Sequence, residues 1–121
     1  MVDYTASETD TPDSLIAGDL KRVTDEIVIL SGQVLVRGAV IGKVTASKKF
    51  ILSLSGAADG SQTPVAVMAE AVDATAGDKR GPAYRTGEFN EAALTLGTGH
   101  TIASVKPLLR DAGIHLKKVI G

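Results

Sequence analysis

From residue 23 onward, short apolar segments alternate with turns that contain glycine or serine, and this alternation predicts a protein built from short strands. The strands are expected at 27–30, 34–36, 40–44, 50–52, 65–69 and 84–89. The segment at 65–69 is apolar on both faces, as a buried strand would be. The regular spacing of these strands favours a small barrel or a sandwich.

The segments between these strands carry residues that favour turns. A turn is expected at 46–48, a loop containing an Asp-Gly pair at 57–61, and a polar connection at 73–82. Gly87 lies inside the expected strand at 84–89, where a glycine often marks a bulge or a tight bend.

One helix is expected within residues 101–112. Its apolar residues follow the i, i+3, i+4, i+7 spacing of a face that packs on a core: Val105, Leu108, Leu109 and Ala112. Gly113 follows, where a left-handed residue commonly ends a helix. With Thr101 as the N-cap, Pro107 would lie in the helix interior at a cost of about 3 kcal/mol. With Ser104 as the N-cap, Pro107 falls in the first turn, where its missing N–H is harmless. We therefore favour Ser104.

A closing strand is expected at 114–120, with Leu116 and Val119 as core contacts. The whole pattern predicts a mainly β protein with one short helix, an α+β fold whose body is a small barrel or sandwich. Residues 15–121 are expected to form this single β-rich domain, preceded by a flexible arm at 1–14.

Composition excludes several classes of protein. Of the 121 residues, 44% are hydrophobic but only 3% are aromatic, so Val, Ile, Leu and Ala must fill the core. Few aromatics argue against a base-stacking platform, and a formal net charge of −1 argues against a basic duplex binder. The absence of cysteine excludes disulfides, thiolate metal sites and thiol catalysis. No apolar run could span a bilayer and no secretory signal is evident, so we expect synthesis in the cytoplasm and no membrane partner.

Charge separates the first 20 residues from the rest. They contain five acidic residues and no Lys or Arg, whereas the remaining chain carries all 13 basic and nine acidic residues, a formal +4. Residues 1–14 show no periodicity and little apolar content, which predicts flexibility. Two interpretations stay open: an untethered chain end, or an arm that orders on a partner. Tyr4, Leu15 and Ile16 are the apolar anchors that such an arm could use.

Two glycine-containing segments come close to phosphate-binding motifs without meeting their requirements. The segment 38–44 has three residues between its glycines where four are required, and Val44 stands where a metal-binding hydroxyl is needed. Strand glycines explain this segment better. The segment 97–99 has two of the three dinucleotide glycines but follows no βαβ unit, so we interpret it as a flexible approach to the helix.

Nothing in the sequence has the pattern of a catalytic or metal site. The chain has no Gly-x-Ser-x-Gly elbow. His100 is expected near the helix entrance and His115 at an outward position, and they fit neither a triad nor a metal motif. Glu88 and Glu91 could form a carboxylate pair, but acids that flank a strand end are usually solvated. We therefore predict no enzyme activity, no catalytic residue, no metal and no cofactor.

Three segments in order resemble the head decoration proteins of lambda-like tailed phages. They are an Asp-Gly turn that leads into an apolar strand at 58–70, a Val-Asp-Ala segment at 72–74, and an aromatic residue followed by a Gly-Glu-Phe strand end at 84–90. Shorter similar pieces occur at 15–19, 37–38, 42–44, 91–95 and 113–114, so the resemblance covers most of residues 15 to 116. The chain departs from lambda's own protein in having no Trp and almost no aromatics.

The resemblance implies a capsid cement protein on the outer surface of a phage virion. Such proteins are similar in forming homotrimers over the local three-fold positions of an expanded capsid. There they clamp major capsid subunits against the pressure of packaged DNA. The resemblance also implies an arm that orders by adding a strand to a sheet of the major capsid protein. The residues expected to contact the capsid are Tyr4, Thr5, Thr11, Pro12, Leu15 and Ile16.

A second class of function is a carrier domain of the barrel-sandwich type, similar to biotinyl or lipoyl domains. Gly38 and Gly42 between hydrophobic residues fit such a domain. A carrier needs a modifiable lysine at a hairpin tip, commonly beside a methionine. Lys48 and Lys49 lie at an expected turn, but Met68 is not beside a lysine. A small hydrolase is a third class, and the sequence lacks the nucleophile and base that it requires.

Overall fold

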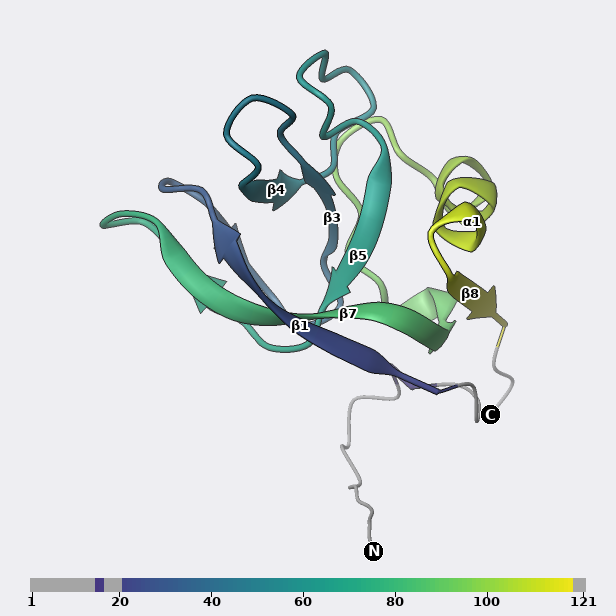
Figure 1. The fold of residues 1–121 in the computed structure, drawn as a ribbon. Helices are drawn as coiled ribbons and strands as arrows, with labels where there is room; N and C mark the ends of the chain where they lie inside the picture. Colours follow the sequence, from purple (N-terminus) through teal and green to yellow (C-terminus); the bar gives the residue numbers. More distant parts are fainter. Residues whose placement is uncertain (1–14, 17–20, 119–121) are drawn as a thin grey trace, which may run out of the picture.

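Five strands close into a barrel in the computed structural model, which describes residues 15–16 and 21–118 (Figure 1). The hydrogen-bonded order around the barrel is β1-β4-β3-β5-β7, and β7 pairs back with β1. The strands are β1 (Val23–Ile29), β3 (Val40–Lys43), β4 (Phe50–Leu52), β5 (Pro64–Met68) and β7 (Lys79–Asn90). The predicted fold class is confirmed, and of the two expected architectures the chain adopts the barrel.

Strand β7 is the longest element and holds the barrel closed. It pairs antiparallel with β1 from Val23↔Thr86 to Ile29↔Lys79. The polar connection predicted at 73–82 is therefore wrong from Lys79 onward. Backbone pairing with β1 makes 79–82 a strand, although Lys79 and Arg80 point their side chains to solvent. The earlier part of this segment contributes β6 (Val72–Asp73), which pairs with β2 (Val34–Leu35) in a separate two-stranded ribbon.

The irregularity expected at Gly87 lies two residues earlier. Val23 pairs with Thr86 but Thr24 pairs with Tyr84, so the extra residue of the bulge is Arg85. Gly87 itself keeps its register and has a φ of +144°, a conformation that favours glycine.

Buried side chains form two clusters that share strands. The first fills the barrel and includes Ile29, Ile41, Ala66 and Met68. The second lies between the barrel wall and the C-terminal elements: Leu15, Val40, Val67, Phe89, Val105, Leu109, Ile114 and Leu116. Ala66 and Met68 belong to the first cluster and Val67 between them to the second, so this strand is buried on both faces, as its sequence predicted.

The helix α1 (Ile102–Asp111) begins one turn earlier than predicted. Its N-cap is Thr101, not Ser104, and the two residues form a capping box. The Ser104 N–H donates to Thr101 Oγ1 at 3.2 Å, and the Thr101 N–H donates to Ser104 Oγ at 2.9 Å. Pro107 therefore lies inside the helix. The reciprocal cap bonds and the complete burial of Val105 and Leu109 offset its cost.

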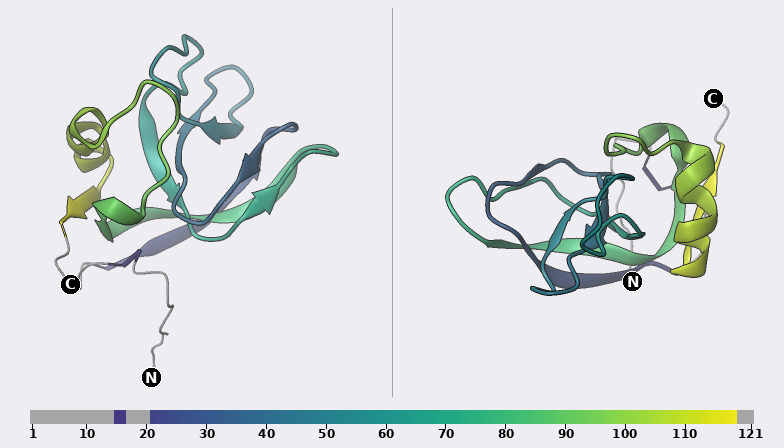
Figure 2. Two further views of the ribbon diagram at one scale, coloured as in Figure 1. Left: turned by 180° about the vertical axis from the view of Figure 1, so that it is seen from behind. Right: turned by 90° about the horizontal axis from the view of Figure 1, so that it is seen from above.

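The last elements form an outer layer beside the barrel. The 3₁₀ turn η2 (Glu91–Ala93) leads toward α1, Gly113 ends the helix with a φ of +98° as predicted, and β8 (Ile114–Lys117) then pairs parallel with the end of β7. In Figure 2, α1 lies against β8 outside the barrel. The strand predicted to reach residue 120 ends at Lys117, and Val119 lies outside the described residues. No helix in the described ranges is long and apolar enough to cross a membrane.

Candidate functional site

The first residues that the structure describes are tied to the end of β7. Ile16 forms an antiparallel bridge with Phe89, and the Asn90 N–H donates a 2.7 Å hydrogen bond to the Leu15 carbonyl oxygen. The Leu15 side chain is 1% exposed and packs in the second cluster. Leu15 and Ile16 are therefore held at a fixed point beside β7.

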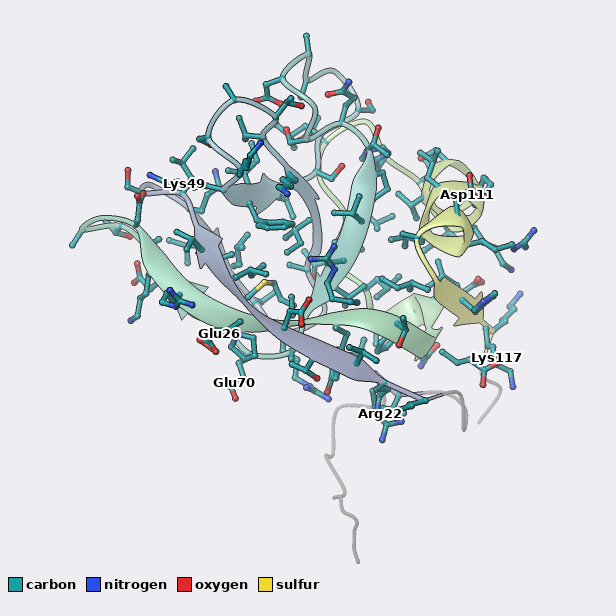
Figure 3. All side chains as sticks on the ribbon, viewed as in Figure 1. Arg22, Glu26, Lys49, Glu70, Asp111 and Lys117 are labelled. Atoms are coloured by element: carbon teal, nitrogen blue, oxygen red, sulfur yellow. The ribbon has the colours of Figure 1, made fainter. Side chains whose placement is uncertain are left out.

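Basic side chains gather at this end of the body. Lys21, Arg22, Lys117 and Lys118 are exposed, and Figure 3 shows Arg22 and Lys117 at the same end of the molecule. The stem of Arg22 lies over Gly87, where an added Cβ would be 3.0 Å from Arg22 Cγ. The glycine thus makes room for a cation beside β7, and the cluster favours an acidic partner.

At the opposite end, His100 joins two loops to the start of α1. Its Nε2 lies 3.2 Å from Ser53 Oγ and 3.1 Å from the Gln62 carbonyl oxygen, and its Nδ1 lies 3.1 Å from Ser104 Oγ. A carbonyl oxygen only accepts hydrogen bonds, so Nε2 carries a proton. The Ser104 hydroxyl donates to the Thr101 carbonyl oxygen at 3.0 Å, and the hydroxyl oxygen is also in contact with Nδ1. Both ring nitrogens thus have hydrogen-bond partners, and the predicted place of His100 at the helix entrance is confirmed.

The Ser53–His100 contact has the spacing of a nucleophile and its base but not the hydrogen-bond pattern. The Ser53 hydroxyl donates to the Ser61 carbonyl oxygen at 2.7 Å, and Ser53 is completely buried. Its proton is therefore committed away from the ring, and no substrate can reach its oxygen. Among the described residues, no cluster of His, Asp or Glu could hold a metal ion.

Two aspartates, Asp59 and Asp78, accept hydrogen bonds that hold loops of the body in place. The Ser61 hydroxyl and backbone N–H both donate to Asp59, which holds the pKa of that carboxyl below its usual value. Asp78 accepts from the Lys49 ammonium and from the Ser31 N–H, which likewise lowers its pKa. These carboxylates stabilise turns.

A comparison with protein-family models matches residues 4–112 to bacteriophage lambda head decoration protein D. The chain belongs to this head decoration protein family. It is a family of structural proteins of the phage head, not of enzymes. A search of curated proteins found no match.

Membership in the decoration family confirms the predicted class, but the predicted capsid contacts remain predictions. Tyr4, Thr5, Thr11 and Pro12 lie outside the described residues. Ile16 is half-buried, and Leu15 is inside the protein's own core instead of presenting its side chain to a partner. Sequence reasoning took Leu15 for an external anchor because its packing partners, such as Phe89 and Leu109, are distant along the chain.

The glycines of the two near-miss motifs have packing roles in this decoration protein. An added Cβ would lie 2.0 Å from the Ser61 carbonyl oxygen at Gly42, and 2.1 Å from the Ser53 carbonyl oxygen at Gly97. The segment at 97–99 is thus packed closely against another loop, which corrects its interpretation as a flexible approach.

Three further sequence interpretations are settled by contacts, by exposure and by the family. Glu91 lies 3.7 Å from the Lys106 ammonium, so it belongs to an ion pair and not to a pair of carboxylates. His115 is exposed between two buried neighbours, as predicted. Met68 is completely buried and Lys49 pairs with Asp78. With the family established, the carrier alternative no longer stands.

Proposed function

We propose that this protein is a cement protein of the expanded phage head. It binds as a homotrimer at local three-fold positions on the outer surface. There it joins neighbouring major capsid subunits and stabilises the shell against the pressure of packaged DNA. The protein is made in the host cytoplasm. The observation that carries this proposal is the family match over residues 4–112.

Residues 1–14 act in this proposal as a flexible arm that adds a strand to a sheet of the major capsid protein. Strand addition draws its affinity from backbone hydrogen bonds and so tolerates a segment rich in Thr and Ser. The fixed departure point at Leu15 supports this role, because it limits where an arm can reach. Three linked arms in a trimer can exceed the affinity of one by about 10²–10⁴.

Decoration of isolated heads tests the proposal. Purified protein is mixed with undecorated heads of the cognate phage, in expanded and unexpanded form, and bound copies are measured after sedimentation. We expect the protein to bind the expanded form only, with three copies at each local three-fold position. Binding to both forms alike, or a stable dimer by light scattering under all conditions, contradicts the proposal.

Deletion of residues 1–14 tests the arm. The deletion removes no described core residue, so the melting temperature should stay unchanged while attachment weakens strongly. Thr11→Pro should weaken attachment at an unchanged melting temperature, because it removes a backbone donor from the added strand. Full decoration by the deletion variant would show that the arm has no part in attachment.

A further inference from the structure

The outer edge of β8 is an open sheet edge in the part of the chain that the structure describes. Strand β8 is the last in the sheet order, and no described element lies beyond it in Figures 1 and 2. The Gly87 N–H donates to the Gly113 carbonyl oxygen, and Gly87 is in register with Ile114. In a parallel ladder with this phase, Ile114 and Leu116 direct their N–H and C=O groups away from β7. Two donors and two acceptors therefore face outward.

This edge is held in a fixed shape. The Ile114 and Leu116 side chains are 0% and 6% exposed and pack in the second cluster with Val105 and Leu109. The pairing with β7 runs without a register shift, and β8 contains no proline. Bulges and prolines are common devices that stop strands from adding to an edge. Neither blocks this one.

The charge around the edge selects what can add to it. His115, Lys117 and Lys118 are exposed on or directly after β8. Arg22, which follows the exposed Lys21 in the chain, lies at the same end of the body as Lys117 (Figure 3). Three acidic residues of the described part are near: Glu88, which is in register with His115, Glu91, which pairs with Lys106, and the exposed Asp111, which ends α1 three residues before β8. The lysines would repel the same edge of a second copy, whereas an acidic strand would be attracted.

We propose that the outer edge of β8 binds an extended acidic segment of the shell protein of the phage head, which adds to the sheet through Ile114 and Leu116. The inference rests on the proposed function, because decoration brings this protein against the shell. The end of β7 pairs with β8 along one edge and with the Leu15–Ile16 tie along the other. Each copy would thus donate one strand through its arm and accept one at β8.

Amide hydrogen exchange of the full-length protein tests the proposal directly. Exchange of the Ile114 and Leu116 amides is measured in the free protein and on undecorated expanded heads of the cognate phage. Both amides should exchange at least about 10-fold more slowly on the heads, because strand addition occupies their outward groups. Unchanged exchange at both positions, with the protein attached, overturns the proposal and leaves the proposed function standing.

Charge reversal tests the selectivity of the edge. Lys117→Glu combined with Lys118→Glu should weaken attachment about 10-fold at low salt. The difference should shrink at 1 M salt, where the Debye length is about 3 Å. Lys43→Glu combined with Lys48→Glu is the matched control, since these lysines are also exposed but are distant from β8. Equal losses in both double variants overturn the proposed site.

Removing single backbone N–H groups gives the most direct comparison between the outward side of β8 and the side that faces β7. An ester bond in place of the amide at Leu116, introduced by semisynthesis, removes an outward N–H and should weaken attachment about 3- to 10-fold at an unchanged melting temperature. The same change at Lys117 removes an N–H that faces β7 and should lower the melting temperature instead. Full attachment by the Leu116 ester overturns the proposal.

Other occupants would show themselves in the same exchange data. Protection of Ile114 and Leu116 in the free protein that rises with concentration would assign the edge to a second copy. Protection that is independent of concentration and is lost on deleting residues 1–14 would assign it to the chain's own arm. Either result overturns the proposal. Failure of the wild-type protein to attach to heads overturns it together with the proposed function.

Discussion

Replacing Leu15 by alanine tests whether this residue fixes the departure point of the chain. The side chain is buried at the end of β7, where it contacts the second cluster beside Phe89. The Leu15 carbonyl oxygen also accepts the Asn90 N–H. The substitution removes the packing while leaving this hydrogen bond possible. It therefore isolates the contribution of the side chain.

The expected loss follows from the burial. Truncating a fully buried leucine costs about 2–5 kcal/mol, which combines lost apolar transfer with a cavity. Because the Leu15–Ile16 segment is short, it can detach instead of leaving an empty cavity, so we expect a cost of about 2–3 kcal/mol. Ile16→Ala is the matched control. Its side chain is only half-buried, and the same truncation there should cost about 1 kcal/mol.

Two measurements on the full-length protein check this prediction. Denaturant unfolding gives the change in the free energy of unfolding. Amide hydrogen exchange at Asn90 reports whether the segment stays docked, because that N–H donates to Leu15. We expect faster exchange at Asn90 in Leu15→Ala. A loss below about 0.5 kcal/mol together with unchanged exchange would refute the role of Leu15 as an internal anchor.

Three further predictions concern the loops and their hydrogen bonds. Gly42→Ala should lower the free energy of unfolding by about 1–3 kcal/mol, because the added Cβ would meet the Ser61 carbonyl oxygen. Gly56→Ala is the control and should be nearly neutral, because its added Cβ meets no atom within 4 Å. Equal effects of the two substitutions on denaturant unfolding would contradict the close approach at Gly42. His100→Ala should cost about 1–3 kcal/mol, since it leaves the Ser53 and Gln62 groups without this partner, and nitrogen NMR of the wild-type ring should show the proton on Nε2. The folded-state pKa of Asp59 lies below its ordinary value of 3.8, so its carboxylate stabilises the fold above pH 3.8 and this stabilisation is lost as the pH falls through the lower folded value. The melting temperatures of wild type and Asp59→Asn should therefore converge below pH 3.8, and a constant difference down to pH 2 would contradict the assignment.

The sequence predicts local structure in this protein better than long-range pairing. Apolar segments between turn residues locate most strands, because their side chains face a core whichever strands they pair with. The pairing of β1 with β7 could not be predicted in this way, because no local pattern marks Lys79 and Arg80 as strand residues. The N-cap was misassigned because the cost of an interior Pro107 was weighed without the reciprocal bonds that Thr101 makes.

The candidate site shows the same difference between local features, which the sequence predicts, and long-range contacts, which it does not. The resemblance pointed to the family that the comparison then established, and this is a family of structural proteins of the phage head. The burial of Leu15 could not be read, because it depends on Phe89 and Leu109 arriving from distant parts of the chain. The open edge of β8 was equally hidden, since the register with β7 decides which backbone groups face outward.

The antiparallel tie between Ile16 and Phe89 also determines how the body would respond to mechanical load. A pull on the chain ahead of Leu15, directed along β7, acts parallel to the paired backbones. Such a force slides the Leu15–Asn90 contact in shear instead of peeling it open one bond at a time. The load then passes along β7 into its long antiparallel pairing with β1, where many hydrogen bonds share it. Tension applied at one end would be spread through the barrel wall, and the helix layer would stay outside the line of force.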